Sequence, residues 1–219
     1  ERVLSFAREK GLYAGEAIWT RYLPMRYRLD EILDSGVIGN VSSLTADLGY
    51  AIAHVERLKK PELAGGALLD LGVYVINFAL MVFGTDIKEI KSSHVKNEYG
   101  VDTHNCIIME FSGGRTALLH SNMNSNTDNR GMIYGDKGRI EFINTNNCEG
   151  IIVTLNDGTV TRYDTPPQIT GFEYEVQSSL AAIAEGSCEC KDMPHSEILR
   201  VMRIMDGLRQ EWGLKYPFE

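Results

Sequence analysis

Residues 65–84 read GGALLDLGVYVINFALMVFG, an almost entirely apolar stretch in a chain of 219 residues. The stretch predicts one helix of about 16 to 18 residues that ends at Gly84, because glycine commonly follows the last helical residue. One side of this helix is wholly apolar, so we expect that side to pack on a sheet. The residues on it are Leu68, Leu69, Leu71, Val75, Phe78 and Leu80.

Two titratable side chains, Asp70 and Tyr74, interrupt the stretch four positions apart. Residues so spaced share one face of a helix, and Ala67 and Asn77 lie on part of that face. A tyrosine whose pKa is tuned by its neighbours can donate a proton to a carbonyl or accept one from an alcohol. The structural alternative is that the helix dipole favours Asp70 and that Tyr74 is an ordinary half-buried aromatic residue. Gly72 costs about 1 kcal/mol relative to alanine here, so we expect another group to approach the backbone closely.

Outside this stretch, helical and strand-like segments are segregated along the chain. Helices are expected at 3–10, 25–35, 172–184 and 196–212, and a charged surface loop at 54–64. Strands are expected at 12–19, 41–50, 87–96, 105–111, 116–122, 131–134, 139–143, 151–155 and 159–163. This order predicts an α+β fold, with a large, mostly antiparallel, open-faced sheet and helices packed on one face.

Composition excludes several classes of function. The net charge of −8 and the pI of about 5.2 disfavour binding to nucleic acid or to an anionic membrane. The longest apolar run, Val73–Phe83, falls short of the roughly 20 residues that span a bilayer. The four cysteines form no zinc or redox motif, so we expect no metal site and reduced thiols in a cytoplasmic protein.

Five motifs, in order, resemble the family of glucose-fructose oxidoreductase, inositol dehydrogenase and rhizopine-catabolism proteins (Gfo/Idh/MocA). The segment GGALLDLGVYVIN is similar to the family pattern G-G-G-x-L-x-D-x-G-x-[YH]. The tyrosine and the W-T-R segment look most like the trans-dihydrodiol and D-xylose dehydrogenase branch. The other four motifs are EAIWTRYLP (16–24), DEILDSGVIG (30–39), IYGDKGRIE (133–141) and MPHSEILRVMRIMDGLR (193–209).

The resemblance implies hydride transfer between NAD or NADP and a sugar, cyclitol or diol. It implies that Tyr74 is the acid–base residue and that Asp70 supports it or the substrate. Trp19 and Arg21 are expected near the substrate or the nicotinamide, with a structural tryptophan and a surface-paired arginine as the alternative. Two more positions are assigned to the site: Gly72, which would leave room for a cofactor, and Asn77, which would reach the substrate or form a local contact.

The resemblance also implies how the protein is organised. Residues 1–18 are expected to be the end of a nucleotide-binding domain. Residues 19–219 would form the C-terminal substrate-binding and dimerisation domain, whose final helix returns toward the first domain. The open sheet is expected to pair into a homodimer or tetramer.

Two family features do not occur in this sequence: the glycine-rich dinucleotide loop and the E-K-P motif that carries the catalytic lysine. We therefore expect the full-length protein to be an enzyme and this chain alone to be inactive. The alternatives are a non-catalytic ligand-sensing or interaction protein on the same fold, or an NAD-dependent glycosidase, which usually has histidine in place of the tyrosine.

Overall fold

An eight-stranded sheet forms the body of the molecule in a computed structural model that describes all 219 residues. The strand order is β2-β3-β4-β1-β5-β6-β7-β8. Six of the seven neighbouring pairs are antiparallel, and only β1 and β4 run parallel. The strands are β1 Val41–Gly49, β2 Ile87–Lys96, β3 Asp102–Phe111, β4 Arg115–Asn122, β5 Arg130–Gly135, β6 Gly138–Ile143, β7 Gly150–Leu155 and β8 Val160–Asp164.

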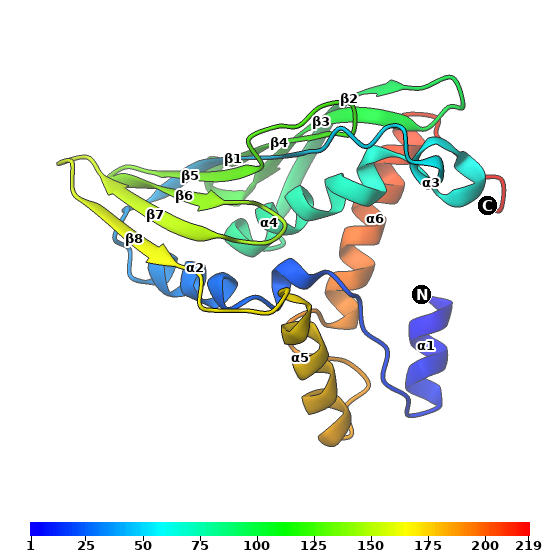
Figure 1. The fold of residues 1–219 in the computed structure, drawn as a ribbon, viewed down its shortest axis with the longest axis horizontal. Helices are drawn as coiled ribbons and strands as arrows, with labels where there is room; N and C mark the ends of the chain where they lie inside the picture. The colour runs from blue at the N-terminus through cyan, green and yellow to red at the C-terminus, as the bar shows by residue number, and fades with distance from the viewer.

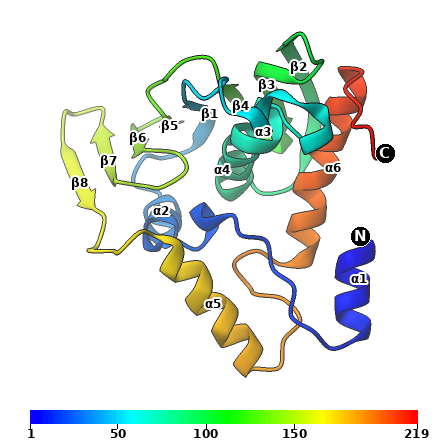
Figure 2. The ribbon, with the colours of Figure 1, turned by 45° about the vertical axis from the view of Figure 1, so that its right-hand side comes forward.

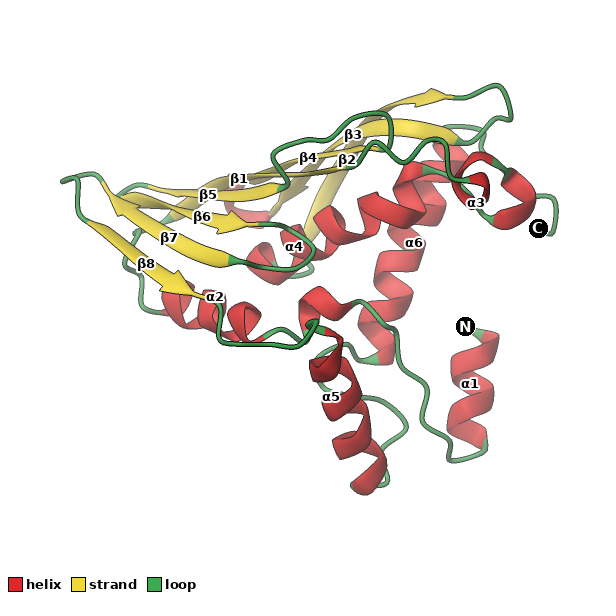
Figure 3. Cartoon of the chain, viewed as in Figure 1, coloured by secondary structure: helices red, strands yellow, loops and turns green.

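The helices lie on one face of this sheet and leave the other face bare (Figure 1, Figure 3). Helices α2, α4 and α6 lie nearest the sheet, whereas α1 and α5 stand away from it in both ribbon views (Figure 2). The α+β class and the open sheet expected from the sequence are confirmed. The helices are α1 Arg2–Glu9, α2 Pro24–Asp34, α3 Glu56–Lys59, α4 Val73–Phe83, α5 Phe172–Ala184 and α6 His195–Glu211.

Buried and more exposed residues alternate along the strands, as expected for a sheet with one covered face. Along β1, Leu44, Ala46 and Leu48 are buried under the helices, and the residues between them lie on the outer face. Phe78 of α4 packs on this inner face, where its ring meets Phe142 with centroids 5.2 Å apart. Hydrophobic burial of this kind is the main stabilising contribution, and the core it forms is continuous across the sheet.

Two segments differ from the expectations. Residues 12–18 do not form a strand, because no other strand of this chain lies beside them to complete a ladder. The expected surface loop at 54–64 contains helix α3 and a 3-10 turn at Pro61–Leu63, so it is more ordered than its charge pattern indicated.

The apolar helix has the predicted length and end, because the π-helical turn Leu68–Gly72 runs directly into α4, which stops before Gly84. The 23-residue segment Pro61–Phe83, which includes the 3-10 turn before the glycine pair, is long and apolar enough to cross a membrane by length and composition alone. The expectation that no apolar run here is long enough was wrong by this measure, because it counted Val73–Phe83 and not the residues that precede α4. However, 67% of its most apolar 18-residue stretch is buried inside the protein, and α4 packs on β1 and β4. The core helix of a folded domain has the same properties.

Candidate active site

A cavity of about 320 Å³ lies between the helix that carries Asp70 and Tyr74 and helix α6. The two helices pack against each other beneath the sheet (Figure 2). One wall presents Asp70, Tyr74 and Asn77, which share a helix face as their spacing predicted. The opposite wall is apolar and consists of Met193 and one stripe of α6, namely Ile198, Val201, Met202 and Met205. Leu69, Val73 and residues 16–18 complete the lining.

The Tyr74 phenol lies in a setting that keeps it protonated. Burial raises its pKa above the ordinary value, and the Asp70 carboxylate raises it further. The indole N–H of Trp19 faces the phenol and opposes this rise, although no hydrogen bond of good geometry joins them. No cation of this chain contacts the phenol, so a proton donor rather than a phenolate is the state that the structure favours.

Asp70 has a cationic partner that the sequence gave no reason to single out. The Arg57 Nη2 donates to Asp70 Oδ1 over 2.6 Å, from the segment just before the glycine pair at 65–66. The arginine is exposed and the carboxylate is only partly so, which makes the pair a solvent-accessible one at the rim of the cavity. Asp70 therefore binds a cation, as expected of a supporting carboxylate, but one supplied by its own chain.

Arg21 and Asn77 form a buried network beside the cavity. The Arg21 Nε donates to Asn77 Oδ1 over 2.7 Å, and Asn77 Nδ2 donates to the Val73 carbonyl over 2.8 Å. Glu197 of α6 lies 3.5 Å from the guanidinium and completes the charge balance. Burial lowers the pKa of Arg21, and the Glu197 carboxylate opposes that shift. The surface-paired alternative for Arg21 is wrong, because its side chain is 6% exposed and joins three elements.

Trp19 stands beside Tyr74 at the end of the irregular segment 12–18. Its ring stacks on Phe172 at the start of α5, with centroids 4.3 Å apart and planes 18° from parallel. Its Nε1 is buried and has no hydrogen-bond acceptor in the protein. A buried donor without a partner is costly, so this N–H is available to an oxygen placed near the phenol.

Gly72 does not have the role predicted for it from the sequence. A Cβ built there would lie 3.0 Å from Leu68 Cδ1 and 3.4 Å from Ser121 Oγ of β4. Gly72 is buried and does not line the cavity. The close approach that its glycine permits is therefore between the helix and the sheet, and the expectation that it makes room for a cofactor is wrong.

Two features of the site were not predicted from the sequence: the apolar wall and Arg57. The wall had a readable signal, since Ile198, Val201, Met202 and Met205 follow the i, i+3, i+4, i+7 spacing of one helix face. No sequence signal pointed to Arg57, because it reaches Asp70 across a loop whose path the local sequence does not determine.

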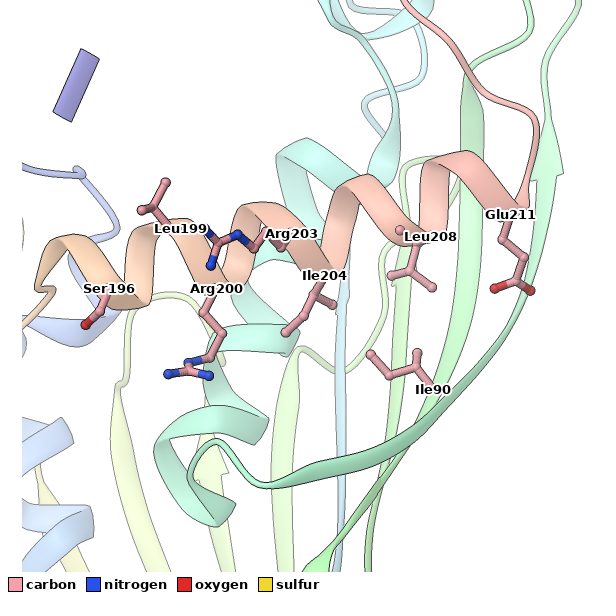
Figure 4. A pocket seen from close by; sticks show the side chains of 9 residues that line it. Ile90, Ser196, Leu199, Arg200, Arg203, Ile204, Leu208 and Glu211 are labelled. Carbon is pink, nitrogen blue, oxygen red and sulfur yellow. The ribbon is translucent and has the colours of Figure 1, made fainter. Parts of the chain in front are cut away.

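A wider groove of about 570 Å³ lies on the outer side of α6, against Ile90 of β2. Arg200 and Arg203 leave the helix there in different directions (Figure 4). Each is already paired, Arg200 with Glu197 over 3.0 Å and Arg203 with Glu1. The groove holds no tyrosine or histidine, and no group of three His, Cys, Asp or Glu residues in the chain is placed to hold a metal ion. Acid–base chemistry is therefore better supported at the Tyr74 cavity.

Comparison with known sequences identifies the family of the chain. A model of the GFO/IDH/MocA C-terminal domain matches residues 27–141. The trans-1,2-dihydrobenzene-1,2-diol dehydrogenase of Danio rerio is 31% identical over 225 residues, covering 99% of this chain and 67% of the relative. The Homo sapiens protein of that name is 29% identical over 221 residues, covering 96% and 65%.

Solved structures share the fold at lower identity. The 3-ketoreductase KijD10 from Actinomadura kijaniata, in complex with NADP and TDP-benzene, superposes with a TM-score of 0.85 at 22% identity, covering 95% of this chain and 65% of that one. An aldose-aldose oxidoreductase from Caulobacter crescentus, complexed with glycerol, has a TM-score of 0.76 at 20% identity, covering 88% and 59%. This chain thus spans about two thirds of the length of most of these relatives, and at such identities the structural likeness shows the fold alone.

Proposed function

We propose that this chain, which belongs to the GFO/IDH/MocA C-terminal domain family, is the substrate-binding domain of an oxidoreductase. The reaction is hydride transfer between NAD or NADP and a sugar, cyclitol or diol. The family membership agrees with the resemblance carried by the five motifs. The observation that carries the proposal is the Tyr74 phenol, held protonated beside Asp70 in a cavity with an apolar opposite wall.

The chain's own residues supply the proton and the surroundings of the reaction. In the reducing direction the Tyr74 hydroxyl donates its proton to a carbonyl oxygen, and in the oxidising direction the phenolate accepts one from an alcohol. The Trp19 N–H is placed to donate to an oxygen at the same position. Asp70 keeps the phenol protonated between turnovers, and the apolar stripe of α6 excludes water from the reacting carbon.

The fit of a nicotinamide can be judged on the residues present. A flat, partly apolar ring suits a cavity of about 320 Å³ with a methionine-rich wall. When bound, the cofactor supplies or accepts the hydride. The complex of KijD10 with NADP supports a nicotinamide cofactor for this chain too, with NADP as the first candidate.

The outer face of the sheet is proposed as the surface of a homodimer or tetramer. Ile108 of β3 and Leu118 of β4 are cross-strand neighbours there and are 41% and 47% exposed. Apolar pairs exposed on a flat sheet commonly mark a protein interface. Sedimentation should show a dimer or larger species that Leu118→Lys converts to monomer, and a monomer of the unsubstituted chain at high concentration would remove this part of the proposal.

The proposal extends to the domain boundary and the compartment. Residues 1–18 are assigned to the edge of a nucleotide-binding domain, since helix α1 stands away from the sheet (Figure 1) and residues 16–18 line the cavity where a cofactor would bind. None of the four cysteines is disulfide-bonded, which agrees with a cytoplasmic protein.

The experiment is a screen of the full-length protein for hydride exchange. NADH and NADPH, and their oxidised forms, are offered with cyclic diols, aldoses and cyclitols, and the nicotinamide absorbance is followed. Saturable turnover with at least one pair of cofactor and substrate is expected. Saturable binding of cofactor without turnover of any substrate class would contradict the proposal and favour the ligand-sensing alternative.

A further inference from the structure

The glycine pair Gly65–Gly66 turns the chain sharply just before the helix that carries the candidate site. Gly66 has φ of +120°, and a Cβ there would lie 2.4 Å from Asp102 Oδ1. A Cβ on Gly65 would lie 2.5 Å from the Leu58 carbonyl oxygen. Both positions require glycine because protein groups approach their backbone closely, which is a use of glycine that the sequence alone did not reveal. We call residues 65 and 66 the glycine elbow.

Asp102 holds the elbow from strand β3. The residue is 1% exposed, and its Oδ2 accepts hydrogen bonds from the Leu68 backbone N–H over 2.8 Å and from Asn105 Nδ2 over 2.9 Å. Leu68 is in the first turn of the helix, where backbone N–H groups have no partner within the helix itself. The helix therefore begins at a point fixed by a residue of the sheet.

Tyr216 holds the elbow from the opposite end of the chain. Its hydroxyl donates to the Gly65 carbonyl over 2.8 Å, and the side chain is buried. The tail is itself anchored, since the Arg209 guanidinium lies 4.6 Å from the ring centroid of Tyr216 and pairs with Glu219 over 2.6 Å. The C-terminal residues thus touch the segment that leads directly into the site.

Asp70 lies within one turn of these two contacts. The stretch Leu68–Gly72 is a π-helical turn, in which hydrogen bonds run from i to i+5 and the helix is locally widened. The position of Asp70 relative to Tyr74 depends on this turn, and the N–H that Asp102 accepts belongs to its first residue. Turns of this type are uncommon and frequently occur at functional sites.

We propose that Asp102 and Tyr216 are positioning residues, which hold the glycine elbow from two sides and thereby fix Asp70 against the Tyr74 phenol. The expected effect on turnover rests on the proposed function, whereas the expected effect on the position of Asp70 does not.

A role in stability alone does not account for the arrangement. Asp102 Oδ1 and Asn105 Oδ1 are buried without a hydrogen-bond partner in the protein. Burying a carboxylate with an unsatisfied oxygen costs stability, and an exposed serine or asparagine would satisfy the same helix N–H at lower cost. A costly group kept under a π-helical turn that carries a site residue indicates that placement, not stability, is what it provides.

The geometric test uses this 219-residue chain with 3-fluorotyrosine in place of tyrosine. Fluorination lowers the phenol pKa, which brings the titration into a range where the protein is folded, and Tyr74→Phe identifies the resonance. Because the Asp70 carboxylate raises the pKa of Tyr74, Asp102→Ala and Tyr216→Phe should both shift this titration to lower pH. Asp102→Asn keeps an acceptor for the Leu68 N–H and should restore the original midpoint.

Phe218→Leu is the matched control, since Phe218 lies in the same tail but is exposed and leaves the Tyr216 hydroxyl in place. Tyr216→Phe removes a single hydroxyl, so it answers the question even if Asp102→Ala does not fold. An unchanged Tyr74 resonance and midpoint in Tyr216→Phe would overturn the proposal.

Kinetics of the full-length protein separate this proposal from the proposed function. Misplacement of a supporting group should lower kcat by up to about 10²-fold in Asp102→Ala and less in Tyr216→Phe, with KM nearly unchanged. Normal turnover in both variants would overturn the positioning role and leave the proposed function intact. If the unsubstituted protein turns over no substrate, the proposed function fails, and the fluorine titration alone decides the placement of Asp70.

Discussion

The two sides of the helix that begins at Ala67 are built on different principles. The side toward the sheet is apolar and fully buried, with Val75, Phe78 and Ala79 packed on the strands. The side toward the cavity carries Asp70 and Tyr74, which are only partly buried and interact with groups from other segments. The sheet side therefore anchors the helix, whereas Asp70 and Tyr74 on the cavity side carry the chemistry and contribute little to stability.

The largest expected effect is on the sheet side. Phe78→Ala removes a ring that is fully buried against Phe142 and leaves a cavity, so the free energy of unfolding should fall by about 3–5 kcal/mol. Val73→Ala on the cavity side of the same helix is the control, because Val73 lines the cavity and is only half-buried, and it should cost about 1 kcal/mol or less. Urea unfolding of both variants checks this. Equal losses would contradict the contrast between the two sides.

A comparable loss is expected where the cavity side is tied to its neighbours. Arg21→Met leaves the buried Asn77 Oδ1 without its donor. It also removes one of the two cations beside Glu197, which keeps Arg200, so it should cost about 2–3 kcal/mol. Arg28→Met, which breaks an exposed pair with Glu31, should cost less than about 1 kcal/mol. Thermal and denaturant unfolding give both values. If Arg21→Met proved as mild as Arg28→Met, the buried network would not be a structural tie.

A smaller, pH-dependent effect concerns Asp102. Burial raises its pKa in the folded protein, so the folded state binds the proton more tightly than the unfolded state does. The free energy of unfolding should therefore fall as pH rises from the unfolded pKa of about 3.9 through the raised folded value. Asp102→Asn should lose this decline. Denaturant unfolding at several pH values measures this. The free energy of unfolding of Asp102→Asn should rise relative to that of the unsubstituted chain as pH rises. A difference between the two that does not change with pH would contradict the raised pKa.

The sequence predicts most of the fold because most of the fold is locally encoded. The strands between 87 and 163 alternate in polarity and are separated by turns such as N-D-G, so their existence can be read, whereas the insertion of β1 between β4 and β5 cannot. The segment 12–18 could not be read correctly, since an apolar run becomes a strand only where another strand lies beside it.

The candidate site was predictable only in part. The shared face of Asp70, Tyr74 and Asn77 follows from helical spacing. The π-helical turn and the partners that hold it do not, because Asp102 acts on Leu68 from 34 positions away and Arg21 acts on Asn77 from 56. Such contacts depend on the folded topology, which no local pattern specifies.

The most direct test of the central claim is the turnover of Tyr74→Phe in the full-length protein. The substitution removes one hydroxyl and no ring, so the free energy of unfolding should change little while kcat falls by about 10²–10⁴-fold. Tyr163→Phe, at the far edge of the sheet on β8, is the matched control and should turn over normally. Undiminished turnover by Tyr74→Phe with a verified substrate would contradict the assignment of this cavity as the active site.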